Sequence, residues 1–136
     1  MHRIISGDVL RFAAHYRGPK FHAVLCDPPY EIGFMGKSWD SRGVSFRVEA
    51  GLPPTIPRAN HHPTVKPIAL TEYLARLILP AAVVGDRRIL VPFAGSGSEC
   101  IGALLAGWET IIGVEREDEY VRIARARLEY HGTKRD

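Results

Sequence analysis

The sequence has little cysteine and no long apolar run, and both absences narrow the class of protein. Its 136 residues contain two cysteines, Cys26 and Cys100, without the Cys/His spacing of a zinc site, and we expect both to be small core residues. No stretch approaches the roughly 20 consecutive apolar residues of a membrane span, and the first residues lack the regions of a secretory signal peptide. We therefore expect a cytoplasmic protein that does not act at a membrane.

Composition and charge exclude little else. Apolar residues make up 46% of the chain and charged residues 24%, which is ordinary for a globular protein and does not indicate disorder. The length fits a single domain, 1–136, that buries roughly two thirds of its unfolded surface. A net charge of +3 permits a polyanionic partner without requiring one.

Short β-rich runs alternate with helical segments along most of the chain. We predict strands at 2–6, 21–26, 87–93 and 109–115, and helices at 8–16, 67–80, 98–107 and 117–132. Strands that alternate with helices predict an α/β fold with a predominantly parallel sheet. Residues 31–66 have little periodicity and are expected to form a long loop.

Two of the predicted helices have informative side-chain patterns. Segment 67–80 has Pro67 at its first helical position and Pro80 as its stop, and its apolar stripe consists of Leu70, Tyr73, Leu74, Leu77 and Ile78. This pattern predicts an amphipathic helix. The last helix begins with acidic residues and continues with Arg122, Arg125 and Arg127, a charge order that suits the helix macrodipole. We expect these arginines to be solvated, and phosphate binding is the less favoured interpretation.

The stretch LCDPPYEIGF, residues 25–34, closes the second predicted strand. Pro28 and Pro29 lack a backbone N–H and fix their own φ, so the strand cannot continue through them. Asp27 then lies at the carboxyl end of a strand, where ligands of open α/β sheets bind. The simpler alternative is that Asp27 only caps the turn.

The stretch LVPFAGSGSECIG, residues 90–102, places Gly95 and Gly97 between a strand and a helix, where backbone N–H groups can approach a ligand. A dinucleotide fingerprint would need a third glycine where Cys100 stands, so a nicotinamide site is disfavoured. Glu115 ends the next strand and is placed to receive both ribose hydroxyls. Together these signals predict an adenosine-like ligand. A tight turn without a ligand, and a first-turn helix charge at Glu115, remain the alternatives.

Three ordered motifs resemble the amino-group DNA methyltransferases of the beta class: DPPY at 27–30, HPTVKP at 62–67 and FAGSGS at 93–98. The segments 33–40 and 113–128 resemble the same family, so the likeness covers most of the chain. The resemblance implies a Rossmann-like, S-adenosylmethionine-dependent methyltransferase fold, circularly permuted and truncated to a sheet of about four strands flanked by helices.

The resemblance also implies an activity and its catalytic residues. The family transfers a methyl group from S-adenosylmethionine to the exocyclic amino group of adenine (N6) or cytosine (N4) in DNA. By that analogy the catalytic residues are Asp27, Pro28, Pro29 and Tyr30. The Asp27 carboxylate and the Pro28 carbonyl would accept the amino N–H groups, and Tyr30 would stack on a base flipped from the helix. Adenine is favoured over cytosine, because relatives with aspartate in this motif mostly use it.

The cofactor-binding set implied by the resemblance is Asp8, Asp27, Thr64, Lys66, Phe93, Gly95, Gly97 and Glu115. Asp8 would contact the adenine amino group, and Thr64 with Lys66 the methionine carboxylate. Lys66 also fits a solvated charge before a helix. No metal is needed, and the adjacent His61 and His62 fit solvent-exposed residues better than ligands.

The chain departs from the family at three places. Val91 stands where many relatives have an aspartate, so a polar contact near the methionine ammonium is missing. Ser98 replaces the usual threonine but keeps the hydroxyl. The loop 31–66 replaces further strands and the target-recognition region, so DNA binding by this chain alone is expected to be weak or non-specific.

The shortened sheet has a consequence for partners. The family's strand order would place 2–6, 109–115, 87–93 and 21–26 side by side in that order, and leave 21–26 as an edge. We therefore expect a homodimer or a partner subunit at this edge. Two functions remain open: a site-specific DNA methyltransferase of a restriction-modification system, or a non-catalytic S-adenosylmethionine-binding remnant or accessory subunit. Methylation of RNA or of protein glutamine is less favoured, because it generally has the opposite motif order.

Overall fold

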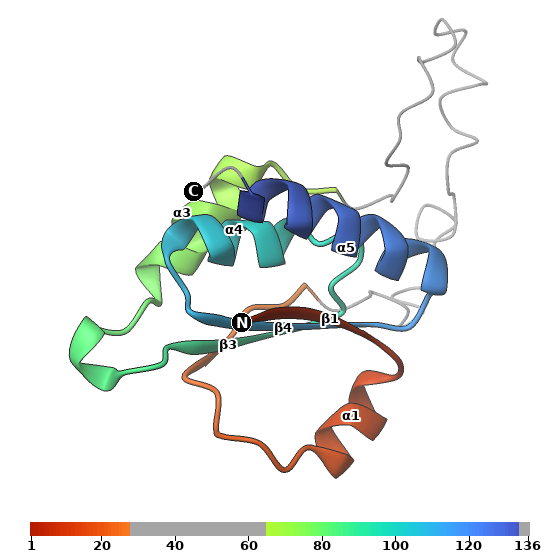
Figure 1. The fold of residues 1–136 in the computed structure, drawn as a ribbon, viewed down its shortest axis with the longest axis horizontal. Helices are drawn as coiled ribbons and strands as arrows, with labels where there is room; N and C mark the ends of the chain where they lie inside the picture. Colours follow the sequence, from red (N-terminus) through yellow and green to blue (C-terminus); the bar gives the residue numbers. More distant parts are fainter. Residues whose placement is uncertain (28–64, 134–136) are drawn as a thin grey trace, which may run out of the picture.

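The computed structural model describes residues 1–27 and 65–133. Its described strands are β1 (His2–Ser6), β2 (Ala23–Val24), β3 (Arg88–Pro92) and β4 (Thr110–Glu115). They form one sheet in the order β1-β4-β3-β2, and every neighbouring pair is parallel (Figure 1). The predicted parallel sheet and the predicted order of its strands are both confirmed.

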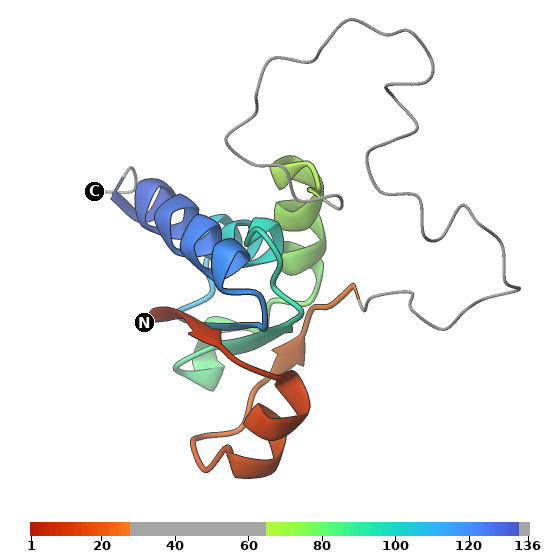
Figure 2. The ribbon, with the colours of Figure 1, turned by 90° about the vertical axis from the view of Figure 1, so that its right-hand side faces the viewer.

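Helices cover the two faces of the sheet unequally. The described helices are α1 (Val9–His15), α3 (Ile68–Leu77), α4 (Ser98–Ala106), α5 (Asp118–Thr133) and the short 3-10 helix η2 (Ala82–Val84). Three of them, α3, α4 and α5, form a layer on one face, while α1 lies below the other face (Figure 1). Figure 2 shows this layer from the side, with α4 between α5 and α3.

The core lies between the sheet and the layer of three helices. Ile89, Val91 and Ile111 of the central strands are 0% exposed and belong to one cluster with buried residues of α4 and α5. Helix α4 is buried almost all round because it has the sheet below it and a helix on each side. Helix α1 contributes no buried residue.

Helix α3 is present as predicted, but its apolar stripe does not pack in the core. The five apolar side chains expected in its stripe are all at least 40% exposed: Leu70, Tyr73, Leu74, Leu77 and Ile78. The helix instead packs on α4 through Thr71 and Ala75, which are 1% and 0% exposed. Small residues bring the two backbones close, because a Cβ atom on Gly102 of α4 would lie 2.5 Å from the carbonyl carbon of Thr71. The Thr71 hydroxyl also donates to the Ser98 carbonyl at 3.0 Å.

Several element boundaries also differ from the predictions. Pro67 is the N-cap of α3, and the helix ends at Leu77, three residues before Pro80. The second strand has two residues, Ala23–Val24, because the sheet pairing of this segment covers only them. Cys100 is buried as expected, but Cys26 is exposed because it lies beyond this short strand.

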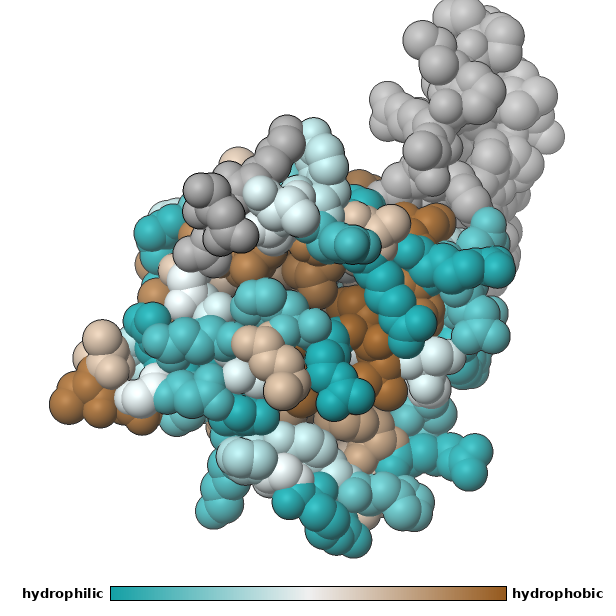
Figure 3. Space-filling view, in the orientation of Figure 1, coloured by the Kyte–Doolittle hydropathy of each residue, from teal (hydrophilic) through white to brown (hydrophobic). Residues whose placement is uncertain are grey.

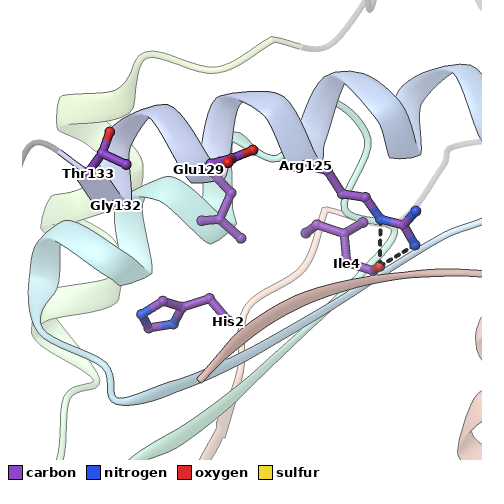
Figure 4. A pocket seen from close by; sticks show the side chains of 7 residues that line it. His2, Ile4, Arg125, Glu129, Gly132 and Thr133 are labelled. Atoms are coloured by element: carbon purple, nitrogen blue, oxygen red, sulfur yellow. Dashed lines mark hydrogen bonds between the residues drawn. The ribbon is translucent and has the colours of Figure 1, made fainter.

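The two edges of the sheet differ. At the β1 edge, the Arg125 guanidinium of α5 donates from Nε and Nη2 to the Ile4 carbonyl, at 3.1 and 2.9 Å. Figure 4 shows this contact beside an open hollow of about 380 Å³ between β1 and α5, which His2 and Thr133 also line. At the opposite edge, β2 pairs with β3 on one side, and the described residues provide no strand on its other side.

An apolar tip protrudes where η2 connects α3 to β3. Val83 is 92% exposed there, and the tip forms the brown projection at the left of Figure 3. None of the described helices is both long enough and apolar enough to cross a membrane.

Candidate active site at the carboxyl ends of the strands

The described members of the predicted site lie near the carboxyl ends of the strands, which all point the same way because the sheet is parallel. Asp8 follows β1, Glu115 ends β4, the turn 93–98 follows β3, and Asp27 follows β2. The order across the sheet is therefore Asp8, Glu115, the turn, and Asp27. In open α/β sheets, ligands bind at the carboxyl ends of the strands.

The turn 93–98 depends on left-handed backbone conformations. Gly95 and Gly97 have φ values of 51° and 83°, and Phe93, which is not a glycine, has a φ of 59°. A side chain at Gly97 would be strained and would also meet Ala124 of α5 at 3.0 Å. A non-glycine residue in this region costs on the order of 1–3 kcal/mol, and such strain clusters at functional sites.

Glu115 ties this turn to the neighbouring strand. One of its carboxylate oxygens accepts the Gly95 N–H at 2.8 Å, and the other accepts the Glu117 N–H at 2.9 Å. A carboxylate oxygen has two lone pairs, so each oxygen keeps one acceptor position. Glu115 can thus shape the turn and still accept a ligand hydroxyl.

Arg127 holds the turn from the other side, and the sequence analysis missed this role. Its Nη1 donates to the Ser96 carbonyl at 2.6 Å, to the Ser96 hydroxyl at 2.9 Å and to the Ser98 hydroxyl at 3.3 Å. Burial lowers the pKa of Arg127, and nearby Glu99 opposes the shift. The expectation of solvated arginines on α5 is therefore wrong for Arg127, which is half-buried and donates to a carbonyl of this turn. Arg125 is exposed as expected, and it also donates to the Ile4 carbonyl of β1.

Asp8 caps the helix α1 in the described part of the structure. Its Oδ1 accepts the N–H groups of Leu10 and Arg11, at 2.9 and 3.0 Å, and so caps the N-terminus of α1. Such a cap stabilises a helix by about 1 kcal/mol, which accounts for an aspartate at this position without a ligand.

Lys66 joins Asp27 to the glycine turn. Its Nζ lies 2.7 Å from Asp27 Oδ2 and 3.1 Å from Glu99 Oε1. Glu99 belongs to the first turn of α4, directly after the turn 93–98, and its side chain is 10% exposed. The strand β2 and the turn after β3 are therefore linked by one shared ammonium group. The sequence analysis did not single out Glu99, although it is the one charged residue in the otherwise small and aliphatic α4.

Electrostatics keep this lysine charged. Burial by itself would lower the pKa of Lys66, but its hydrogen bonds to Asp27 and Glu99 outweigh burial and raise the pKa above the usual value. Burial raises the pKa of the Cys100 thiol, so that this cysteine stays neutral and unreactive next to Glu99.

Four predicted site residues lie outside the described part of the chain: Pro28, Pro29, Tyr30 and Thr64. The same is true of His61 and His62. Within residues 1–27 and 65–133, no group of three acidic, histidine or cysteine side chains could hold a metal ion.

The sequence is similar to parts of known methyltransferases, although no protein-family model matches it. Over 71 residues, 52% of its length, it is 46% identical to the Type II methyltransferase M2.DpnII of Streptococcus pneumoniae, and the match covers 25% of that protein. Over 101 residues, 74% of its length, it is 32% identical to a tRNA (guanine(10)-N2)-dimethyltransferase of Pyrococcus abyssi, and the match covers 26% of that protein. The chain thus spans about a quarter of the length of the curated relatives it matches.

A solved structure shares the fold. The crystal structure of the M1.HpyAVI-SAM complex has a TM-score of 0.65 to this chain and covers 94% of this chain and 100% of that chain, at 18% identity. The expected Rossmann-like fold is confirmed by this likeness and by the parallel four-stranded sheet. The chain therefore has the Rossmann-like α/β fold of methyltransferases, and half of its sequence is similar to part of a Type II DNA methyltransferase.

Proposed function

We propose that this protein is an S-adenosylmethionine-dependent DNA methyltransferase of the beta class that modifies an exocyclic amino group, N6 of adenine in preference to N4 of cytosine. The observation that carries the proposal is the contact of Lys66 with both Asp27 and Glu99. Through this contact, Asp27 and the first turn of α4, directly after the glycine turn, share one ammonium group, which supports a common site. These two parts must share one site for methyl transfer to occur.

The described residues fit the proposed cofactor by the chemistry of their side chains. Glu115 has acceptor positions for ribose hydroxyls next to the Gly95 amide. Lys66 offers an ammonium group for a carboxylate, and the exposed face of Phe93 offers an aromatic surface. Asp8, Gly97 and Thr64 complete the proposed binding set. When bound, S-adenosylmethionine supplies a methyl group on a positively charged sulfur.

The proposed role of Asp27 is to orient the acceptor amino group. Its carboxylate accepts one N–H, and the Pro28 carbonyl accepts the other, so that the nitrogen lone pair is directed out of the base plane. Pro29 keeps this turn rigid, and Tyr30 stacks on the flipped base. The residues supply position and electrostatic stabilisation, and no metal takes part.

Substitution of Asp27 by alanine tests the activity. With the unchanged chain, we expect label from methyl-labelled S-adenosylmethionine to enter DNA. We expect the Asp27→Ala variant to transfer the label at least 100-fold more slowly, which is the usual effect of removing a group that stabilises developing charge. Binding of the cofactor, measured by calorimetry, should weaken far less than the transfer rate, because Asp27 is one member of a larger proposed cofactor-binding set.

The other outcomes identify competing functions. Cofactor binding without transfer by the unchanged chain would favour a non-catalytic or accessory subunit, which the short match to its relatives also supports. If label enters tRNA but not DNA, tRNA takes the place of DNA as the proposed substrate. We use tRNA as the matched control because the chain is similar to a tRNA methyltransferase. Analysis of the methylated nucleosides distinguishes adenine from cytosine.

We also propose that the chain acts as one domain, with loop 31–66 in place of a recognition region, and that the outer edge of β2 pairs with a second copy or a partner subunit. In contrast to the β1 edge, which Arg125 covers, β2 has an exposed Val24. It lies on the same side of the molecule as α3 (Figure 2), and the apolar stripe of α3 is exposed. Site specificity in DNA would then come from the assembly.

Sedimentation velocity tests whether the protein self-associates through the outer edge of β2. We expect a concentration-dependent dimer at micromolar protein, and expect Val24→Lys to shift it toward monomer, because a lysine on an edge strand opposes pairing. Leu10→Lys is the matched control, since Leu10 is equally apolar and 76% exposed but lies on α1. A monomer at all concentrations, or equal effects of the two variants, would contradict homodimerisation through β2.

A further inference from the structure

Glu99 is a nearly buried charge, and its ion pair with Lys66 and its place in the first turn of α4 offset only part of the cost of burying it. It belongs to α4, whose other eight residues are small or aliphatic, and its side chain is 10% exposed. Removing a carboxylate from water costs free energy that an ion pair repays only partly, and apolar replacements of buried ion pairs are often as stable. A charge held at such a position is more easily explained by binding than by stability.

The Glu99 carboxylate shares its ion-pair partner with a second carboxylate. The Nζ atom of Lys66 lies 3.1 Å from Glu99 and 2.7 Å from Asp27, so one ammonium group faces both. Arg127 acts on Glu99 only through space, because the hydrogen bonds of its Nη1 go to Ser96 and Ser98. A positively charged ligand group would therefore be stabilised at Glu99.

The position of Glu99 suits one end of the proposed cofactor. The amino-acid end of S-adenosylmethionine carries an ammonium and a carboxylate on the same carbon. Lys66 and Glu99 present the complementary charges, with Nζ and Oε1 3.1 Å apart. Val91, which stands where many relatives have an aspartate, is 0% exposed and packs in the apolar core, so it cannot supply this carboxylate.

We propose that Glu99 receives the α-ammonium group of the cofactor while Lys66 receives its carboxylate, so that the pair selects ligands with a complete amino-acid end. The inference rests on the proposed function and adds to it a binding residue on α4. In the ligand-free protein, Lys66 pairs with both Glu99 and Asp27. On binding, the single contact between Lys66 and Glu99 is replaced by two contacts with the ligand, one from Lys66 to its carboxylate and one from Glu99 to its ammonium group.

Calorimetry with three probes tests the inference. The probes are S-adenosylhomocysteine, its deaminated analogue without the α-ammonium, and 5′-methylthioadenosine, which lacks the amino-acid end. We expect the unchanged protein to bind S-adenosylhomocysteine about 10- to 100-fold more tightly than the deaminated analogue, the range for a charge-assisted hydrogen bond. In the isosteric Glu99→Gln variant this ratio should fall to about 1–3, while binding of 5′-methylthioadenosine changes less than about twofold.

A matched variant and the remaining outcomes separate the possibilities. Glu72→Gln removes a partly exposed carboxylate of α3 that pairs with Arg76, and it should leave all three affinities unchanged. Equal weakening of all probes by Glu99→Gln would mean a structural role and would overturn the inference. So would an unchanged protein that binds S-adenosylhomocysteine and its deaminated analogue equally, a result that needs no variant. If none of the probes binds, both the proposed function and the inference fail. If the probes bind with equal affinity, only the inference fails.

Discussion

Replacement of Trp108 by alanine is expected to lower the free energy of unfolding by about 3–5 kcal/mol. Trp108 is 1% exposed and is the largest fully buried side chain of the described residues. It follows Gly107, which closes α4 in a left-handed conformation, and its indole N–H donates to the Ala75 carbonyl of α3 at 3.0 Å. The substitution would open a cavity and leave this carbonyl unpaired, out of a total stability of about 5–15 kcal/mol for a typical domain.

The control for this prediction is Trp108→Phe. Phenylalanine keeps most of the buried ring but has no N–H, so we expect a smaller loss of about 1–2 kcal/mol. Urea unfolding followed by far-UV circular dichroism measures both variants, because the substitution removes the fluorescence of Trp108 itself. A loss below 1 kcal/mol for the alanine variant would show that Trp108 does not connect α3 to the core in solution.

The second large effect is expected at the contact between α3 and α4. An alanine at Gly102 would place its Cβ 2.5 Å from the carbonyl carbon of Thr71 and 2.6 Å from the backbone nitrogen of Glu72. These are backbone atoms, so no side chain can turn away and α3 must shift. We expect the Gly102→Ala variant to lose about 2 kcal/mol or more, even though alanine favours a helix over glycine by about 1 kcal/mol.

Gly132→Ala is the matched control because it makes the same change in another helix. A Cβ atom on Gly132 of α5 would meet nothing within 4 Å. The gain in helix propensity is then unopposed, and we expect stability to rise by roughly 0.5–1 kcal/mol. Thermal unfolding should therefore move in opposite directions for the two variants. A neutral Gly102→Ala variant would mean that α3 does not approach α4 as closely as the structure has it.

The strands of the sheet could be predicted from the sequence because the features that specify them lie within a few residues of one another. Buried parallel strands such as Arg88–Pro92 and Thr110–Glu115 contain short apolar runs, and each is followed by a turn or helix signal within a few residues. The order of the strands required the family resemblance in addition, because local patterns do not specify which strands become neighbours.

The packing of α3 could not be predicted in the same way. A period of 3.6 identifies an apolar stripe but does not say which face meets a neighbour. The stripe containing Leu74 and Leu77 is exposed because Gly102 lets α4 dock on the opposite, small-residue face at Thr71. A contact between two segments about 30 residues apart decided this orientation.

The residues of the candidate site also fall into two groups, those that could be predicted from the sequence and those that could not. Asp27, Glu115 and the turn 93–98 were identified from the sequence because they follow strands, and strand ends in a parallel sheet meet at one edge. Glu99 and Arg127 were missed because each lies on a helix and acquires its role only from what the helix packs against. A glutamate among the small and aliphatic residues of α4 was the available signal for the first of them.

The sequence by itself determined which segments are strands and helices, and that an acidic turn and a glycine turn each follow a strand. Tertiary structure alone decided that Lys66 bridges Asp27 to Glu99, that Arg127 braces the glycine turn, and that the apolar stripe of α3 faces outward. The physical reason is that backbone preferences and periodicity act over a few residues. Charge pairing and close helix packing depend on distances between parts of the chain that only the fold brings together.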